Sequence, residues 1–296
     1  MKILLSGGTG FLGRYLLKRC IQEGFEVMGL QRSTSNSYRI KEVMDRITFY
    51  DVDQIDMESI FKKHTVDMVV NTVTDYGRTD KSIANILETN LMFSIRLLEC
   101  AVNHNVRTFM NTDTLLEKEI NAYALSKNQL VQWMQFLSDK INMVNIKIEH
   151  MYGPLDDENK FIYWVIKQLK DNVEKIDLTS GIQKRDFIYI AEIVDAYMTV
   201  IKNSEQFSAF DEFELGSGNS IEVKRFLDLL YSKIQQNQEL NTRLNFGAVA
   251  YRENENMYMQ ANISKLRSLG WQARVKLEDG IQNILDGELN DATRTA

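Results

Sequence analysis

A strand pattern that breaks into four glycines and continues at once as a helix pattern constrains this chain more than any other stretch. Residues 3–13 read ILLSGGTGFLG, and the apolar periodicity of a helix follows. Such a turn exposes the first N–H groups of the helix and the positive end of its dipole. Gly7, Gly10 and Gly13 keep side chains away, so a pyrophosphate can approach the backbone. The pattern predicts a dinucleotide-binding loop, with a ligand-free glycine turn as the alternative. The residues of this loop expected at the cofactor are Gly7, Thr9, Gly10, Phe11, Leu12 and Gly13.

The first half of the chain alternates short β-branched runs with longer helical patterns. The runs predict strands at residues 2–6, 25–30, 47–52, 66–73, 106–111 and 144–150, and helices at 11–23, 59–64, 82–104 and 122–140. Alternation of this kind is typical of a parallel sheet with helices on both faces. We therefore predict an α/β protein with a Rossmann-type, doubly wound parallel sheet in residues 1–153. Residues 154–296 are expected to form mainly a smaller, mixed α/β substrate lobe, with the chain crossing back near residues 182–202.

Composition excludes several classes of protein. The 296 residues carry a net charge of -6 and no basic run of five or more, which argues against nucleic acid or an anionic membrane as a partner. With 44% hydrophobic residues, no apolar run near membrane-spanning length and no visible signal peptide, we expect a globular protein of the cytoplasm. Cys20 and Cys100 fall in helical patterns without a Cys/His cluster, so no disulfide framework or metal site is expected.

The end of the second predicted strand is where the adenosine ribose of a dinucleotide would bind. An acidic residue there would accept from the 2′-hydroxyl of NAD, but the strand runs into Gln31, Arg32 and Ser33. An arginine and a hydroxyl suit a 2′-phosphate, so the sequence favours NADP(H) over NAD(H); a solvated Arg32 is the alternative. Asp51 and Val52 close the third strand. Asp51 is a candidate acceptor for the adenine amino group, or else the start of a turn.

Tyr123 and Lys127 stand four residues apart in the helical segment NAYALSKNQ and therefore share one face. Free tyrosine has a pKa of about 10 and is a poor acid–base catalyst at neutral pH. A neighbouring ammonium and the positive nicotinamide ring would favour the phenolate and lower that pKa. We expect both residues to be catalytic and to bind the cofactor, although a surface pair with this spacing is common by chance.

These motifs resemble the extended short-chain dehydrogenase/reductases that act on nucleotide sugars, over nearly the whole chain. GGTGFLG and YALSK match the two signatures, and ETNLMFSIRLLECA is similar to the helix that carries an asparagine, here Asn90. QKRDFIYIAEIVDAY, FELGSGNSIEVKRFLDLL and LGWQARVKLEDGI look like the later signatures. The resemblance implies that Asn90 lies at the cofactor and that a hydroxyl after the fifth strand holds the sugar oxygen. The segment VRTFMNTDT puts Thr114 in that catalytic role and Thr112, two residues earlier, at the substrate.

Further segments, including VVNTVTDYGR and KIEHMYGPLDDENKF, resemble the CDP-abequose synthase branch, a group of CDP-sugar 4-ketoreductases. The likeness implies reduction by NADPH of C4 of a CDP-4-keto-3,6-dideoxy sugar, in the biosynthesis of lipopolysaccharide O-antigen or another surface polysaccharide. Leu115 and Leu116 stand where 4,6-dehydratases of the family carry an Asp-Glu pair, which disfavours dehydration. Two alternatives remain: a 4-epimerase that retains NAD, and a non-catalytic NADP-binding protein.

Substrate contacts are expected from two regions. Asp75, Tyr76 and Arg78 follow the fourth predicted strand and are candidates for the sugar site, with an ordinary polar loop as the alternative. His150 and Arg185 are candidates for the nucleotide diphosphate, with a core histidine and a structural salt bridge as the alternatives.

The resemblance also implies the partners of the chain. These are a nucleotide sugar, with a CDP-sugar favoured, and a second copy of the chain. The helices predicted at residues 82–104 and 122–140 would pack with their counterparts in a four-helix bundle.

Overall fold

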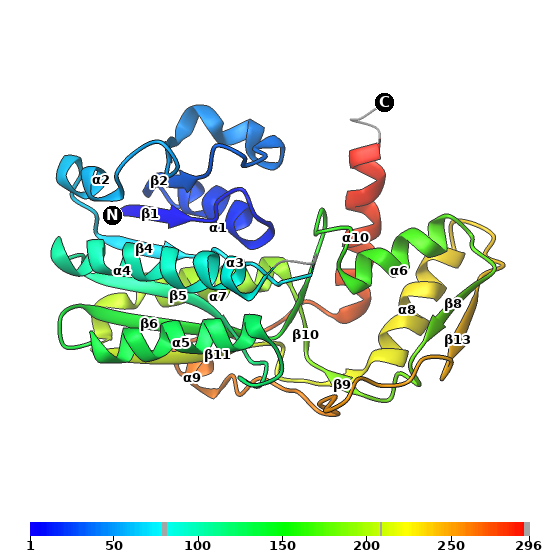
Figure 1. Ribbon diagram of the computed structural model, residues 1–296. Helices are drawn as coiled ribbons and strands as arrows, with labels where there is room; N and C mark the ends of the chain where they lie inside the picture. Colours follow the sequence, from blue (N-terminus) through cyan, green and yellow to red (C-terminus); the bar gives the residue numbers. More distant parts are fainter. Residues whose placement is uncertain (79–81, 208, 293–296) are drawn as a thin grey trace. The chain divides into compact units, whose positions relative to one another are not determined.

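The computed structural model describes residues 1–78, 82–207 and 209–292, and the chain forms two compact units (Figure 1). The first unit consists of Met1–Ile148, Val194–Glu214 and Ser264–Trp271. The second consists of Glu149–Ile193, Leu215–Ile263 and the chain from Gln272 onward. The division predicted from the sequence, at residue 153 with a return near residues 182–202, stays a prediction about domains. The compact units divide after Ile148, and the chain returns to the first unit twice.

A seven-stranded sheet forms the centre of the first unit, in the order β11-β6-β5-β4-β1-β2-β3. Its strands are β1 (Lys2–Ser6), β2 (Glu26–Gln31), β3 (Thr48–Asp51), β4 (Met68–Asn71), β5 (Thr108–Thr114), β6 (Asn142–Ile148) and β11 (Phe210–Leu215). Strands β1 to β6 pair in parallel, outward from β1 to β3 on one side and through β4 to β6 on the other. This order is that of a doubly wound sheet with its switch point between β1 and β4. The predicted Rossmann-type fold is confirmed.

Helices cover both faces of this sheet, which is why its strands are apolar at successive positions. Leu4, Val69 and Phe109 are register partners on β1, β4 and β5, and they share a completely buried cluster with residues of α2, α4 and α5. Figure 1 shows α4 and α5 in front of the sheet. Helices α1 and α7 are joined to each other by ion pairs, among them Arg19 with Asp195 at 2.6 Å. The helical segments of this unit are α1 (Phe11–Gln22), η1 (Tyr38–Arg46), α2 (Met57–Lys63), α3 (Ile83–Leu87), η2 (Glu88–Met92), α4 (Phe93–Asn103), α5 (Ala122–Phe136), the end of α7 (Ile190–Lys202), η3 (Ser204–Gln206) and α9 (Ser264–Ser268).

The long helix predicted at residues 82–104 is not one regular α-helix. Its middle, η2, is a π-helical turn between α3 and α4, and this turn carries Asn90. A π-turn widens the helix by one residue and re-aims the side chains around it, and such turns are frequent at functional sites. Apolar periodicity alone does not distinguish this turn from a continuous helix.

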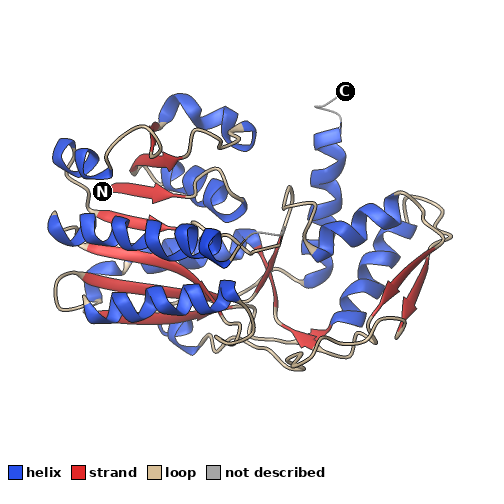
Figure 2. Ribbon diagram, in the orientation of Figure 1, coloured by secondary structure: helices blue, strands red, loops and turns tan. Residues whose placement is uncertain are grey.

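The second unit has short strand pairs and three longer helices (Figure 2). Its elements are β7 (His150–Tyr152), α6 (Phe161–Lys170), β8 (Lys175–Leu178), β9 (Lys184–Arg185), β10 (Phe187–Tyr189), β12 (Ile221–Glu222), α8 (Val223–Gln235), β13 (Arg243–Phe246) and α10 (Leu277–Ala292). Its core is centred on aromatic rings, with Phe187 stacked on Phe226 at 4.2 Å between ring centroids. None of the helices in the described parts of the chain is both long and apolar enough to cross a lipid bilayer.

The loop between β1 and α1 has room for backbone only. Gly7 has a φ of 75°, a left-handed conformation that favours glycine. A Cβ atom on Gly13 would lie 2.0 Å from the carbonyl oxygen of Gly7, far inside van der Waals contact. The third glycine of the motif therefore lets the first turn of α1 pack directly on the end of β1, as the sequence spacing requires.

We predict that Gly13→Ala lowers the free energy of unfolding by about 2 to 4 kcal/mol, because a clash with backbone cannot be relieved by a rotamer change. Urea unfolding followed by circular dichroism measures the loss. Gly24→Ala is the matched control, because Gly24 has a φ of 79° but nothing within 4 Å of an added Cβ. Its loss should be limited to the conformational penalty of about 1 kcal/mol. Equal losses for the two variants would contradict the packing argument.

Candidate functional site

The amino end of α1 offers unobstructed backbone to an anion. Gly10 is the N-cap residue and makes no side-chain hydrogen bond to the helix, while its own N–H donates to the carbonyl of Gly7 at 2.9 Å. Phe11 and Leu12 have buried side chains, so only their main chain can face a ligand in this turn. The first-turn N–H groups and the helix dipole would bind a dinucleotide diphosphate, and Gly10 places no side chain in front of them.

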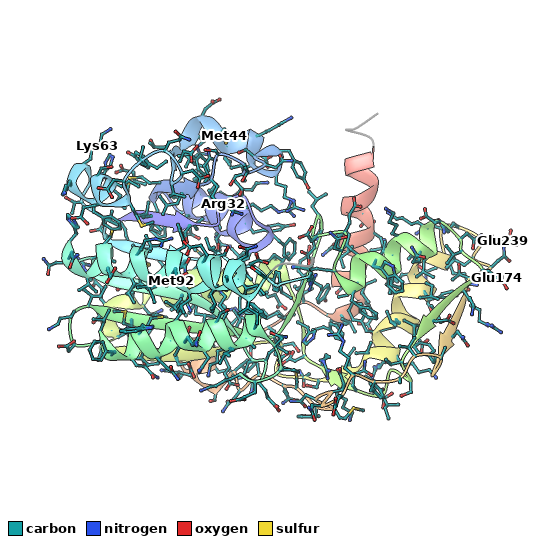
Figure 3. All side chains as sticks on the ribbon, viewed as in Figure 1. Arg32, Met44, Lys63, Met92, Glu174 and Glu239 are labelled. Atoms are coloured by element: carbon teal, nitrogen blue, oxygen red, sulfur yellow. The ribbon has the colours of Figure 1, made fainter. Side chains whose placement is uncertain are left out.

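The loops after β2 and β3 are tied together at the expected adenosine end. The Ser33 hydroxyl donates to the Asp51 carboxylate at 2.6 Å, and the Ser33 N–H donates to Asp53 at 2.9 Å. Val52, partly buried, packs on the core of the first unit. Arg32, labelled in Figure 3, is exposed and directly precedes Ser33 in the chain. The site therefore presents one cation and two carboxylates near the predicted 2′ position.

Tyr123, Thr114 and Lys127 come together at the carboxyl end of β5 and the amino end of α5. Asn121 caps α5 by accepting the Ala124 N–H at 2.8 Å, which fixes where the helix begins. The Thr114 side chain hydrogen-bonds to Tyr123. The completely buried Lys127 donates from Nζ to two carbonyl oxygens, those of Val73 at 2.8 Å and Thr112 at 3.0 Å.

The pKa of Tyr123 is raised well above its ordinary value, chiefly because burial disfavours the phenolate. Burial also lowers the pKa of Lys127 to about 8, and the charge of Asp113 opposes that shift. Burial of the phenol therefore outweighs the lowering of its pKa that the sequence led us to expect from the Lys127 ammonium and the nicotinamide ring. Lys127 directs its ammonium to two carbonyl groups, and loss of water around the phenol dominates. At neutral pH, Tyr123 is a protonated phenol that can donate.

Thr112 and Thr114 have different surroundings although they are two residues apart. The Thr112 hydroxyl is buried against Tyr197 of α7, with 2.7 Å between the two oxygens. The Thr114 side chain, in contrast, interacts with the Tyr123 phenol. The Thr112 carbonyl, rather than its hydroxyl, serves the site by accepting from Lys127.

The loop after β4 lies against Tyr123. The Tyr76 ring is 5.0 Å from the Tyr123 ring, centroid to centroid, and the Arg78 guanidinium is 4.9 Å from the Tyr76 ring. Asn90 holds this loop from the π-turn: its carbonyl oxygen accepts the Asp75 N–H at 2.7 Å, and its amide donates to the Asp75 carbonyl at 2.9 Å. The structure therefore brings Tyr76 and Arg78 together with Tyr123, the predicted catalytic tyrosine, and Asn90 is completely buried behind the loop.

His150 and Arg185 belong to the second unit, and each is paired with a carboxylate. The ring Nδ1 of His150 lies 2.8 Å from Glu149, whose side chain is almost completely buried. Arg185 forms an ion pair with Glu255 and donates to the Lys184 carbonyl at 2.8 Å. A buried carboxylate on one ring nitrogen leaves the other nitrogen of His150 to face a ligand. Within the described ranges, no three His, Cys, Asp or Glu side chains converge as a metal ion would need.

Sequence reasoning missed the carboxylates beside the predicted residues. Asp113 stands between the two threonines and is buried, and Glu149 directly precedes His150. Strand alternation carries a usable signal for Asp113, because the residue between two inward threonines must point to the opposite face. Glu255 lies seventy residues beyond Arg185, and no local pattern connects the two.

Comparisons with known proteins agree with this geometry. The sequence profile of the NAD dependent epimerase/dehydratase family matches residues 3–216. A CDP-abequose synthase of Salmonella muenchen is 32% identical over 293 residues, covering 96% of this chain and 97% of the relative. The solved UDP-glucose 4-epimerase of Thermotoga maritima, in complex with UDP-glucose, has a TM-score of 0.83 at 20% identity and covers 99% of this chain and 100% of its own. MoeE5 in complex with UDP-glucuronic acid and NAD has a TM-score of 0.82 at 15% identity, covering 98% of this chain and 100% of its own.

The family match spans more than half of the chain and includes the glycine loop, Tyr123 and Lys127. It extends through the whole sheet of the first unit and through the RDF segment of the second unit. The chain belongs to the NAD dependent epimerase/dehydratase family, within the extended short-chain dehydrogenase/reductases, and is an NAD(P)-dependent oxidoreductase.

Proposed function

We propose that this enzyme reduces the C4 carbonyl of a CDP-4-keto-3,6-dideoxy sugar with NADPH. The observation that carries the proposal is the arrangement of Tyr123, with Thr114 beside its phenol and the buried Lys127 one helical turn away on α5; burial of the phenol favours its protonated form. A ketoreductase must deliver one proton to the carbonyl oxygen in each turnover, so a protonated tyrosine is the form that the reaction consumes. The CDP-abequose synthase that shares 32% of its sequence with this chain is named for a CDP-sugar, which supports the substrate class.

The residues divide the proton transfer between them. NADPH, when bound along the glycine loop, supplies the hydride that C4 receives. The Tyr123 O–H bond breaks as its proton passes to the carbonyl oxygen, which becomes the C4 hydroxyl, and the phenolate regains a proton from water. The Thr114 hydroxyl stabilises the developing alkoxide, and Lys127 favours the transient phenolate. Donors fixed in place before the reaction supply most of such stabilisation.

Tyr123→Phe should lower turnover by a factor on the order of 100 or more while leaving binding of NADPH intact, because only the proton donor is lost. The assay follows the loss of NADPH absorbance with freshly generated CDP-4-keto-3,6-dideoxyglucose. Tyr163→Phe is the control, because it removes a buried tyrosine hydroxyl of the second unit that donates to the Gly153 carbonyl at 3.1 Å.

Stoichiometric loss of NADPH by the wild type supports reduction, and unchanged turnover in Tyr123→Phe would remove this residue as the acid. An epimerase would convert its sugar with no net loss of either nicotinamide cofactor. A protein that binds the cofactor but converts no nucleotide sugar would be a binding protein.

Arg32 supports the choice of NADPH over NADH. It is exposed at the end of β2, and none of the described residues forms an ion pair with its guanidinium. The carboxylates of Asp51 and Asp53 nearby are engaged by Ser33, so their charges are partly offset by hydrogen bonds. A guanidinium fork in this position matches the oxygens of a 2′-phosphate.

Arg32→Ala should reduce the preference for NADPH over NADH by a factor of about 10 or more, through a higher KM for NADPH, since a charge-assisted pair is worth about 1.5 to 3 kcal/mol. Ratios of kcat/KM for the two cofactors measure the preference. Arg46→Ala removes an exposed arginine from the same unit and controls for net charge. If the ratio is the same in wild type and Arg32→Ala, the 2′-phosphate assignment is wrong.

We infer that the active enzyme is a homodimer through α5 and the helix before it. Leu125, Trp133 and Phe136 follow one face of α5, and Phe136 is 74% exposed. Met92, labelled in Figure 3, adds an exposed apolar side chain from η2. A contiguous exposed apolar face of this kind marks an interaction surface. Pairing this face with its copy would form the four-helix bundle that the resemblance implies.

Phe136→Glu should convert the dimer to a monomer, because a charge would be buried at the centre of the apolar contact. Light scattering after size-exclusion chromatography measures the mass. Phe161→Glu changes an equally aromatic, exposed position in the second unit and should leave the mass unchanged. A monomeric wild type would overturn the inference.

A further inference from the structure

A ladder of buried amide side chains crosses the central sheet just before the strands end. Ser6, Asn71, Asn111 and Asn145 are successive register partners on β1, β4, β5 and β6, and all four are completely buried. The Ser6 hydroxyl donates to Asn71 at 2.6 Å, and Asn71 donates to Asn111 at 3.2 Å. Asn111 donates to Asn145 at 3.0 Å, so the chain of donors runs in one direction across four strands. Buried polar groups are costly unless they are paired, and here each amide is paired with the next.

The ladder ends on two carboxylates. The Asn145 amide donates to Asp113 at 2.9 Å and to Glu212 of β11 at 2.9 Å. Lys147 neutralises Glu212 at 2.5 Å, and Glu212 is partly exposed. Asp113 is 7% exposed and accepts the Thr114 N–H at 2.8 Å. The structure therefore holds one buried carboxylate immediately before the catalytic threonine.

Strand alternation explains which way Asp113 points. Thr112 directs its hydroxyl to Tyr197 of α7, so its neighbours Asn111 and Asp113 point to the opposite face, which α4 and α5 cover. Asn71, on the same face, donates to Ser94 of α4 at 3.0 Å. Lys127 lies on α5 and donates to the Thr112 carbonyl, the group bonded to the Asp113 nitrogen.

The ladder also touches the second group that holds Lys127. Asn71 accepts the Val73 N–H at 3.4 Å, and the Val73 carbonyl accepts from Lys127. The Thr112 carbonyl belongs to the residue directly after Asn111, and the Val73 carbonyl belongs to the residue two positions after Asn71. Each carbonyl that binds the ammonium is therefore close in sequence to a residue of the ladder. A completely buried ammonium that meets only neutral carbonyls is strongly disfavoured, and a nearby carboxylate offsets this.

We propose that Asp113, held by the amide ladder, is the counter-charge of Lys127 and a positioning residue of the Thr114–Tyr123–Lys127 site. Asp113 acts electrostatically and through the backbone, and it does not touch the reacting atoms. Its negative charge keeps Lys127 cationic and acts against the phenolate of Tyr123, so the two catalytic groups remain an ammonium and a phenol. The charged and titratable groups around Asp113 are Lys127 on α5, Lys147 on β6, Glu212 on β11, Tyr123 on α5 and Tyr197 on α7.

The effect of Asp113 on catalysis rests on the proposed function, but its charge interaction with Lys127 does not. The test measures this charge interaction separately from catalysis. Lysine labelled with carbon-13 at Cε is incorporated into the full chain, and the Lys127 signal is assigned by its absence in Lys127→Arg. The signal is titrated from about pH 6 to about pH 10 in wild type, Asp113→Asn and Glu212→Gln. Glu212→Gln is the matched control, because it makes the same change on the same Asn145 amide but at a carboxylate that Lys147 already neutralises.

Wild-type Lys127 should titrate at about 8. Asp113→Asn should move this midpoint down by about one pH unit or more, because the negative charge of Asp113 stabilises the ammonium. Glu212→Gln should leave the midpoint in place. Equal midpoints in wild type and Asp113→Asn, or equal shifts in both variants, would overturn the proposal.

A second measurement uses the cofactor alone. Binding of NADPH and of NADH, followed by their fluorescence, should weaken at lower pH in Asp113→Asn than in wild type, because Lys127 loses its proton earlier. If neither cofactor binds the wild type, the proposed function fails, while the Lys127 titration still decides the role of Asp113. If Asp113→Asn does not fold, the wild type carries the test: the Lys127 signal should shift again at acid pH as Asp113 becomes protonated, and a flat signal would overturn the proposal.

Discussion

The buried ammonium of Lys127 is the constraint on which the site depends. It is completely buried, and it draws together the Val73 carbonyl after β4, the Thr112 carbonyl of β5 and helix α5. Three segments distant in sequence are thereby held in one arrangement, and Tyr123 is placed one helical turn away from the charge. Taking a charge out of water is expensive, so the surrounding sheet must supply groups that make the burial tolerable. The buried polar residues near the strand ends supply such groups, at positions where apolar side chains would otherwise continue the core.

Local patterns were sufficient to predict the fold and to select candidate site residues that the structure brings together. The glycine spacing, the β/α alternation and the YALSK segment predicted the Rossmann-type sheet, the loop and the tyrosine–lysine pair, because each depends on residues close in sequence. The π-turn at Asn90 and the pairing of Arg185 with Glu255 were not predictable, since they depend on packing between distant segments. The pKa of Tyr123 was expected to fall and is raised instead, because side-chain spacing does not reveal how much water remains around a group.

Asn90 holds the loop after β4 in place, a structural role that its position in the sequence does not reveal. The cofactor contact that the resemblance implies stays a prediction; within the protein, the Asn90 amide makes two hydrogen bonds with the Asp75 backbone and a third with Ser126 of α5 at 3.0 Å. The π-turn directs this amide at the loop that carries Tyr76 and Arg78. The geometry of the loop beside Tyr123 is therefore set from the helix rather than by the loop residues themselves.

The interleaving of the two units has a consequence for how the chain is made. The first unit needs Val194–Glu214 for the outermost strand and Ser264–Trp271 for α9, yet segments of the second unit precede, separate and follow these two segments in the sequence. During synthesis, the glycine loop and Tyr123 emerge early, but the sheet that supports them lacks its last strand until more than two thirds of the chain has been made. An incomplete sheet exposes an unpaired strand edge, which is prone to association. For a ribosome-bound chain of this design, the open edge of β6 is the surface that needs protection.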